Sequence, residues 1–251
     1  MLLCGLCGAR AAEPDDFKVD GKAVEALLFR PIGDGRFPGV LLIPGYERSA
    51  RDMIPLGSRL AAMGFAAVAV SQPGFGRSKG PPDFVGPYTL RVLTIAYRKL
   101  QAEPFVDPAR MGIFGYSRGG MAASLLAVQL DDVQAAVFGA GIYDFARAYQ
   151  DAIPGVRRNM RDETGMTPEA IRARSSILRM DRLRCPVLIL HGDRDERVPV
   201  SQALLLRDQL TRLHKDFEIR IFKGRPHSIG PEAAGAAVDF LQRRLAPRKG
   251  T

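Results

Sequence analysis

From Asp15 onward, short apolar runs alternate with amphipathic stretches along this chain. Short runs rich in Val, Ile and Leu are typical of buried strands, and apolar positions spaced three and four apart are typical of helices that cover a sheet. The alternation predicts an α/β fold, with a mostly parallel central sheet and helices on both faces. We expect strands at 23–29, 40–43, 66–70, 111–114, 135–138, 187–190 and 218–222, and helices at 55–63, 90–101, 117–129, 201–213 and 232–245.

One segment, residues 145–184, interrupts this alternation. It lies between two predicted strands and is longer than a simple crossover requires, so we expect a short helical cap inserted into a single domain that spans 15–248. The segment contains nine arginines and five acidic residues. Its arginines form either a solvated helix face or a lid over the active site that favours an anionic or carboxylate-bearing substrate.

The composition fits one globular domain. A chain of 251 residues, 46% hydrophobic and 25% charged, can bury one sizeable core. The net charge is +9, but the 36 Lys and Arg are scattered among 27 acids, so we do not expect nucleic-acid binding. No segment approaches the roughly 18 consecutive apolar residues of a membrane span. The sequence does not indicate an oligomeric state.

Residues 1–12 have features of a clipped secretory signal. Leu2 to Ala9 are apolar or small, and Ala9-Arg10-Ala11 has the form of a cleavage site. We therefore expect a secreted or periplasmic protein. The segment lacks a basic start and a full-length apolar core, so a misassigned start or a disordered tail, in a cytoplasmic protein, is the alternative.

The cysteines indicate neither a disulfide framework nor a zinc site. Cys4 and Cys7 fall in the leader, which leaves Cys185 as a lone candidate for a buried thiol. We expect no metal and no cofactor.

The pentapeptide Gly115-Tyr116-Ser117-Arg118-Gly119 follows the apolar run 111–114 and opens a predicted helix. This is the context of a nucleophile elbow, in which the serine occupies a strained strand-to-helix turn and the flanking glycines remove Cβ atoms that would clash. Ser117 is therefore the candidate nucleophile. The backbone N–H of Arg118, at the helix N-terminus, is a candidate oxyanion donor.

A serine nucleophile needs a base, and the chain has three histidines. His227 follows the predicted strand 218–222 and lies in a loop at the same edge of the sheet as Ser117, so it is the candidate base. His191 stands beside a strand end, where we expect a structural role. His214 follows a helix and is expected to be a solvated helix end or cap.

An acid that holds the base can come from the loop after the predicted strand 187–190. Asp193 and Asp195 both lie in this loop, and either could orient the imidazole and stabilise its charged form. The order Ser, Asp, His, each after a successive parallel strand, is that of the α/β-hydrolases.

With these motifs the chain resembles the α/β-hydrolase superfamily over nearly all of 15–248, and within it the dienelactone hydrolase-like and prolyl oligopeptidase-like branch. His191-Gly192-x-x-Asp195-x-x-Val198-Pro199 is similar to the acid loop of that branch, which implies that Asp195 is the triad acid. Gly74-Phe75-Gly76-Arg77-Ser78 resembles a structural turn of these hydrolases. Dienelactone hydrolases proper use a cysteine nucleophile, and the oligopeptidases carry a propeller for which this chain has no room, so neither specificity is carried over.

The resemblance also implies the rest of the oxyanion hole. Pro44-Gly45-Tyr46 stands where many relatives have His-Gly-x, so the Tyr46 N–H is the expected second donor. Its phenol either adds a hydrogen bond or packs as a partly buried ring.

These residues predict a serine hydrolase that works by Ser-Asp-His acyl transfer, with Ser117 as nucleophile, His227 as base and Asp195 as orienting acid. We expect a small-molecule ester as substrate, anionic if the cap arginines face it. Thioester or small-peptide amide hydrolysis is the alternative activity, and a non-catalytic binding protein on the same fold is the alternative class. Dehalogenation would require an aspartate at position 117.

Overall fold

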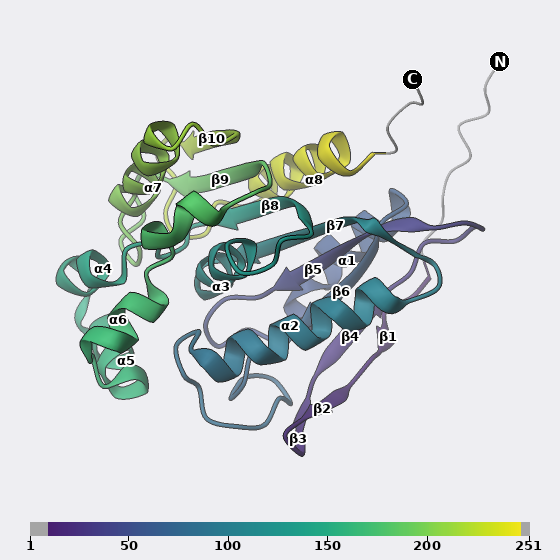
Figure 1. Ribbon diagram of the computed structural model, residues 1–251, viewed down its shortest axis with the longest axis horizontal. Coiled ribbons are helices and arrows are strands. Elements are labelled where there is room, and N and C mark those ends of the chain that lie inside the picture. Colours follow the sequence, from purple (N-terminus) through teal and green to yellow (C-terminus); the bar gives the residue numbers. More distant parts are fainter. Residues whose placement is uncertain (1–9, 247–251) are drawn as a thin grey trace.

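An eight-stranded sheet forms the centre of the molecule, as the computed structural model of the protein shows for residues 10–246 (Figure 1). The strand order is β1-β4-β6-β5-β7-β8-β9-β10; β4 is antiparallel to its neighbours, and all pairs from β6 to β10 are parallel. A two-stranded sheet, β2-β3, stands apart. The strands are β1 (Glu13–Pro14), β2 (Phe17–Val19), β3 (Lys22–Val24), β4 (Ala26–Phe29), β5 (Phe37–Ile43), β6 (Ala66–Val70), β7 (Val106–Tyr116), β8 (Val133–Gly139), β9 (Val187–Gly192) and β10 (Phe217–Phe222).

Helices cover both faces of the sheet because the buried strands are apolar on both sides. In β5, Leu41 and Ile43 belong to one apolar cluster, and Val40 and Leu42 belong to the other. The first cluster packs beneath α2, α3 and α7, and the second beneath α1 and α8 (Figure 1). The predicted α/β-hydrolase fold class is thus confirmed. These helices are α1 (Ile54–Ala62), α2 (Pro87–Ala102), α3 (Arg118–Ala127), α7 (Ser201–Arg212) and α8 (Pro231–Leu245), with a short 3-10 turn, η1 (Ala50–Met53), before α1.

The predicted strand at 23–29 is wrong as a single element. The structure divides it at Glu25 into β3, which pairs with β2, and β4, which pairs with β6. The Glu25 side chain is buried and accepts hydrogen bonds from Ser71 Oγ at 2.7 Å and from the Arg77 amide at 3.0 Å. A charged side chain that turns inward to meet these donors marks the point at which the chain changes partner strand.

That carboxylate also explains the glycine turn at 74–78. Gly76 has a φ of +55°, and a Cβ there would lie 2.1 Å from Glu25 Oε2. The hydroxyl of Ser78 accepts from the Glu25 amide and donates to the Ser71 carbonyl, at 2.9 and 2.7 Å. The turn is therefore built around the buried carboxylate.

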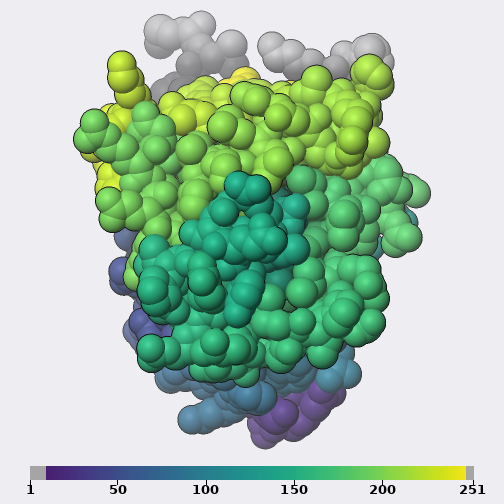
Figure 2. Space-filling view, turned by 90° about the vertical axis from the view of Figure 1, so that its left-hand side faces the viewer, coloured from purple at the N-terminus to yellow at the C-terminus, as the bar shows by residue number. Residues whose placement is uncertain are grey.

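Residues 145–184 contain four short helices: α4 (Phe145–Asp151), α5 (Pro154–Thr164), α6 (Pro168–Arg174) and the 3-10 segment η2 (Ser176–Arg182). Proline occupies the first position of both α5 and α6, and Gly165, with a φ of +66°, ends α5. We call α4, α5 and α6 the cap. Figure 1 places it beside the carboxyl ends of the parallel strands, and Figure 2 shows it as the teal and green middle of that face.

Most of the predicted leader, residues 1–9, lies outside the described residues. Arg10 does lie within them, and its amide donates to the Arg30 carbonyl at 3.1 Å. Among residues 10–246, no helix is both long enough and apolar enough to cross a membrane.

The backbone of α3 lies directly against the sheet. A Cβ on Gly119 would lie 2.0 Å from the Ile43 carbonyl oxygen, and one on Gly115 would lie 1.9 Å from the Gly119 carbonyl oxygen. Real Cβ atoms do not approach backbone so closely, and these neighbours are not flexible side-chain ends. The elbow therefore requires glycine at both positions.

We expect Gly119→Ala to lower the free energy of unfolding by about 3 kcal/mol or more, because the added methyl must displace backbone rather than a side chain. Urea unfolding monitored by circular dichroism measures the change. Gly235→Ala, inside α8, is the matched control, because a Cβ there meets nothing closer than an Arg59 side-chain nitrogen at 3.9 Å. The control should be unchanged or up to about 1 kcal/mol more stable. Equal stabilities of the two variants would contradict the close approach of Gly119 to the Ile43 carbonyl.

Candidate active site

Ser117 occupies the turn between β7 and α3. Its φ and ψ are 57° and −121°, a conformation that non-glycine residues rarely adopt. Its amide donates to the Gly139 carbonyl at 2.7 Å, and its carbonyl accepts from the Met121 amide at 3.1 Å. The sharp turn leaves the hydroxyl at the wall of a cavity.

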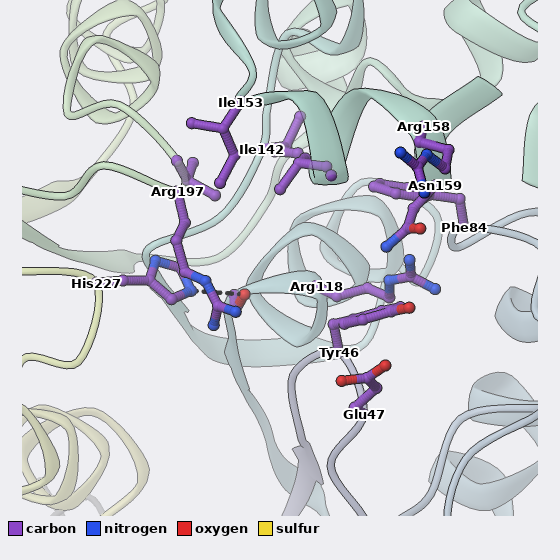
Figure 3. A pocket seen from close by; sticks show the side chains of 14 residues that line it. Tyr46, Glu47, Phe84, Arg118, Ile142, Ile153, Arg158, Asn159, Arg197 and His227 are labelled. Carbon is purple, nitrogen blue, oxygen red and sulfur yellow. Dashed lines mark hydrogen bonds between the residues drawn. The ribbon is translucent and has the colours of Figure 1, made fainter. Parts of the chain in front are cut away.

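The structure brings Ser117, His227 and Asp195 together, as the sequence predicts. Ser117 Oγ lies 2.8 Å from His227 Nε2, and His227 Nδ1 lies 2.7 Å from Asp195 Oδ2 (Figure 3 draws the serine–histidine bond). An ionised carboxylate only accepts hydrogen bonds, so Nδ1 carries the imidazole proton. Nε2 is then unprotonated and faces the serine hydroxyl as an acceptor.

Asp195, and not Asp193, is the acid at His227. Asp195 is buried, and its Oδ1 accepts from the amides of Arg197 and Val198, both at 2.9 Å. Asp193 is exposed, and its Oδ1 accepts from the Gly224 amide at 2.6 Å. The carboxylate of Asp195 therefore has donors on both oxygens, whereas Asp193 closes a surface turn.

Two opposing effects set the pKa of Asp195. Burial by itself raises the pKa of this carboxyl, but the hydrogen bonds from His191 and His227 outweigh it. The pKa of Asp195 is consequently well below its usual range. The group stays ionised through the neutral range and can balance a positive charge on the imidazole.

His191, expected to be structural, lies directly against Asp195. It is fully buried, with Nε2 2.8 Å from the Val198 carbonyl oxygen and 3.3 Å from Asp195 Oδ2. It thus ties the acid loop to the end of β9. His214 follows α7 with a φ of 51°, and its amide bonds to the Thr211 carbonyl.

Tyr116 positions His227, a role that the sequence reasoning missed. Its hydroxyl donates to the His227 carbonyl and accepts from the Ile229 amide at 3.3 Å. The ring is also a neighbour of the imidazole, with centroids 5.9 Å apart. Its place next to Ser117 in the elbow was the only available signal, because the partner is a backbone carbonyl 111 residues away.

The two predicted oxyanion donors flank the serine. Arg118 begins α3, and the loop of Tyr46 follows β5, where a Cβ on Gly45 would lie 3.2 Å from Ser117 Cβ. Within residues 10–246, neither the Arg118 nor the Tyr46 amide donates to a protein acceptor. Figure 3 shows the Tyr46 phenol pointing away from His227. The Tyr46 ring therefore packs against its neighbours, which is the second of the two expectations for this side chain. The backbone amide of Tyr46 is the group that is left to bind an oxyanion.

Gln72 fixes this oxyanion loop and was also missed. Its buried Nε2 donates to the Pro44 carbonyl at 2.8 Å. The residue follows β6, directly before the glycine turn, so nothing in the local pattern connects it with the loop after β5.

Ser117 and His227 line two cavities. One, of about 350 Å³, lies under the cap and has mostly apolar walls that include Phe84, Ile142 and Val156. The other, of about 420 Å³, extends toward α1 and the start of α8. A substrate with its scissile bond at Ser117 could therefore have its acyl part in one cavity and its leaving group in the other. Within residues 10–246, no cluster of three or more His, Cys, Asp or Glu side chains could hold a metal ion.

The lowered pKa of Asp195 predicts how acid affects stability. In the unfolded chain an aspartate titrates near pH ~3.9, and the folded pKa is lower. The contribution of Asp195 to the free energy of unfolding is therefore complete above about pH 4 and is lost as the pH falls through the folded pKa. In urea titrations, the stability difference between wild type and Asp195→Asn should shrink steadily below about pH 4.

Measurements of enzyme activity test the same variant, Asp195→Asn, against a matched control, Asp193→Asn. At neutral pH, Asp195→Asn should lower kcat by about 10³- to 10⁴-fold, because the wrong tautomer of His227 is then favoured. Asp193→Asn makes the same chemical change in the surface turn and should keep most of the activity. A stability difference that does not vary with pH, or equal activities of the two variants, would contradict the assigned contacts.

Comparisons with known proteins agree with this fold. Residues 87–246 match the prolyl oligopeptidase family. The uncharacterized peptidase YtmA of Bacillus subtilis is 30% identical over 221 residues, which cover 85% of this chain and 84% of that protein. The probable carboxylic ester hydrolase LipM of Mycobacterium tuberculosis is 29% identical over 72% of this chain and 45% of its own length.

Among solved structures, an acylaminoacyl peptidase of Pyrococcus horikoshii has a TM-score of 0.82 at 21% identity, covering 96% of this chain and 43% of that one. This chain therefore spans most of YtmA but less than half of LipM and of the acylaminoacyl peptidase. The dienelactone hydrolase-like part of the expected resemblance stays a prediction. The chain belongs to the prolyl oligopeptidase family of serine hydrolases, on the α/β-hydrolase fold.

Proposed function

We propose that the protein is a serine peptidase that cleaves an amide bond in a small peptide-like substrate, with Ser117 as nucleophile. The observation that carries the proposal is the chain of hydrogen bonds from Ser117 Oγ to His227 Nε2 and from His227 Nδ1 to Asp195, at 2.8 and 2.7 Å. The names of the relatives favour peptidase activity, so the order of preference from the sequence, ester before amide, is reversed.

The reaction proceeds by acyl transfer. His227 Nε2 takes the proton of Ser117, and the alkoxide attacks the carbonyl carbon. The amides of Arg118 and Tyr46 receive the oxyanion, while Asp195 stabilises the imidazolium. His227 then protonates the leaving amine. A water molecule, activated by the same histidine, attacks the acyl-enzyme and releases the acid.

Cavity size supports a small substrate. A space of about 350 Å³ is at the lower end of ligand sites and fits one or two residues or a short acyl chain. Its aliphatic and aromatic walls favour an apolar group next to the scissile carbonyl.

Ester hydrolysis is the second candidate activity. LipM, a relative of this chain, is named as a probable carboxylic ester hydrolase. The same triad serves both reactions, and an alkoxide leaves with less help from a general acid than an amine does. An ester substrate is therefore compatible with every residue of the site, and so is a thioester.

Substrate preference and nucleophile can be tested together. We expect a fluorophosphonate probe to label Ser117, and we expect turnover of aminoacyl and dipeptidyl p-nitroanilides as well as p-nitrophenyl esters. Ser117→Ala should abolish labelling and lower kcat by about 10⁴-fold or more. Ser58→Ala, on α1, is the matched control and should retain both.

Fluorophosphonate labelling that survives Ser117→Ala would show that Ser117 is not the nucleophile. A wild-type protein that is not labelled would contradict the proposal that the protein is a serine hydrolase. Turnover of esters and acyl-CoA thioesters without any turnover of anilides would select the second candidate.

We also propose that the substrate is anionic. The proposal rests on the two arginines that line the cavity, Arg158 and Arg197, and not on the number of arginines in the cap. Several of the cap arginines have protein partners, as in the ion pairs Arg147–Asp151 and Arg172–Glu169 at 2.7 and 2.9 Å. Arg158 lines the cavity under the cap. No ion pair of its side chain occurs among residues 10–246.

Arg197 adds a second positive group to that cavity. Figure 3 shows it beside the serine–histidine pair, with Arg158 on the cap side. Glu47 is the acidic side chain among the lining residues. Two exposed guanidinium groups against one carboxylate favour a substrate with a carboxylate end.

We expect Arg158→Gln to lower kcat/KM for a succinyl p-nitrophenyl ester by about 3- to 10-fold relative to its neutral butyryl analogue, because one charge-assisted hydrogen bond is lost. Arg161→Gln, on the same helix, is the control, because Arg161 is exposed and lies 3.6 Å from Asp162. Equal rates of the wild type with the two esters would contradict an anionic preference.

A further inference from the structure

The side chain of Arg118 has a second connection to the site, apart from its amide. The guanidinium is buried, with 4% of the side chain exposed, and Glu163 of α5 binds it with both carboxylate oxygens. Nη1 donates to Oε2 and Nη2 to Oε1, each at 2.8 Å. This paired geometry fixes both the distance and the orientation of α5 relative to the residue after the nucleophile.

Aromatic rings enclose the same guanidinium. Its central carbon lies 4.1 Å from the ring centroid of Phe84, 4.5 Å from that of Tyr46 and 5.3 Å from that of Phe75. Tyr46 carries the second oxyanion amide, and Phe84 lines the cavity under the cap. The Arg118 side chain is therefore the point at which the oxyanion loop and the cavity wall meet.

Glu163 also holds Phe84 directly. Its Oε2 accepts from the Phe84 amide at 2.7 Å, and Arg174 of α6 donates through Nε to the Phe84 carbonyl at 2.9 Å. Phe84 and Val85 have φ values of 44° and 57°, which bulky residues rarely adopt. Such backbone persists only where its surroundings hold it, and here two cap side chains hold the N–H and the C=O of Phe84.

Glu163 shares a helix face with the residues that line the cavity. Val156 and Asn159 lie seven and four positions before it on α5, a spacing that places all three on one side of the helix. The carboxylate that binds Arg118 is thus on the same rigid element as Val156 and Asn159, which we call the cap wall. Movement of that wall away from Ser117 requires the paired hydrogen bonds to break.

We propose that Glu163 is a specificity-determining positioning residue, which sets the cap wall and Phe84 at the distance from Ser117 that suits acyl groups large enough to fill the cavity. The inference rests on the proposed function, because it takes Ser117 as the nucleophile. It concerns acyl size and holds for amide and ester substrates alike. A group as small as acetyl fills only a small part of the cavity of about 350 Å³, so its turnover should be affected less.

Glu163→Gln tests the role, because glutamine keeps the size and can still accept from the Phe84 amide but loses the paired, charged contact with Arg118. We expect the ratio of kcat/KM for p-nitrophenyl hexanoate to that for p-nitrophenyl acetate to fall at least about tenfold. Glu169→Gln is the matched control on α6, since Glu169 is exposed and pairs with Arg172 at the surface. It should leave the ratio unchanged.

The outcomes separate this inference from the proposed function. If the wild type is not labelled by the fluorophosphonate, the proposed function fails and this inference fails with it. If wild type and Glu163→Gln are both labelled and their ratios agree within about twofold, the proposed function stands and Glu163 has only a structural role.

A second variant covers the case in which Glu163→Gln does not fold. Glu163→Asp keeps the charge and draws the carboxylate back by one methylene, so it should lower the same ratio. An unchanged ratio in this variant overturns the proposal.

Discussion

The contact of α3 with the backbone of the sheet is the constraint on which the site depends. Because Gly115 and Gly119 lack side chains, the first turn of α3 lies against the carbonyls at the end of β5. That approach forces Ser117 into a φ of 57° and turns its hydroxyl out of the fold. It also leaves the Arg118 amide at a helix start, where a helix has no acceptor for it. The positions of the proposed nucleophile and of one proposed oxyanion donor thus both follow from one backbone packing.

The parallel sheet supplies the rest of the site, because the loops after β7, β9 and β10 all emerge at the same edge. Each loop is then tied to a neighbour by a polar group. Asp195 closes its own loop through two backbone amides, Tyr116 holds the carbonyl of His227, and Gln72 holds the loop of Tyr46. Hydrogen bonds of this kind keep the proposed reacting groups in place before substrate arrives, which is the condition for electrostatic stabilisation of a transition state.

Charge in the cap has two different uses. Glu163 and Arg174 are directed inward and hold the Phe84 segment, while ion pairs such as Arg147–Asp151 lie at the surface. The exposed pairs stabilise little, since solvent screens them. The buried pair of Arg118 and Glu163 differs, because an unpaired charge at that depth would be costly, so the cap and the elbow are held in one relative position. An excess of arginine in a segment therefore does not by itself indicate a binding surface.

The sequence determined most of the elements and the side chains that we propose to react. Periodicity located the parallel strands and glycine spacing located the elbow, which are local properties of the chain. His227 was singled out by its position after a strand, by chain order and by the scarcity of histidine. The choice of Asp195 over Asp193 came from a resemblance, and geometry gave it a reason: one carboxylate is buried under His227 and the other closes a surface turn. Only the tertiary structure decided the division of a predicted strand at Glu25, the contact of Tyr116 with His227 and the pairing of Arg118 with Glu163. These interactions join residues from 45 to 111 positions apart, or a side chain to a backbone group, and no local pattern records such pairs.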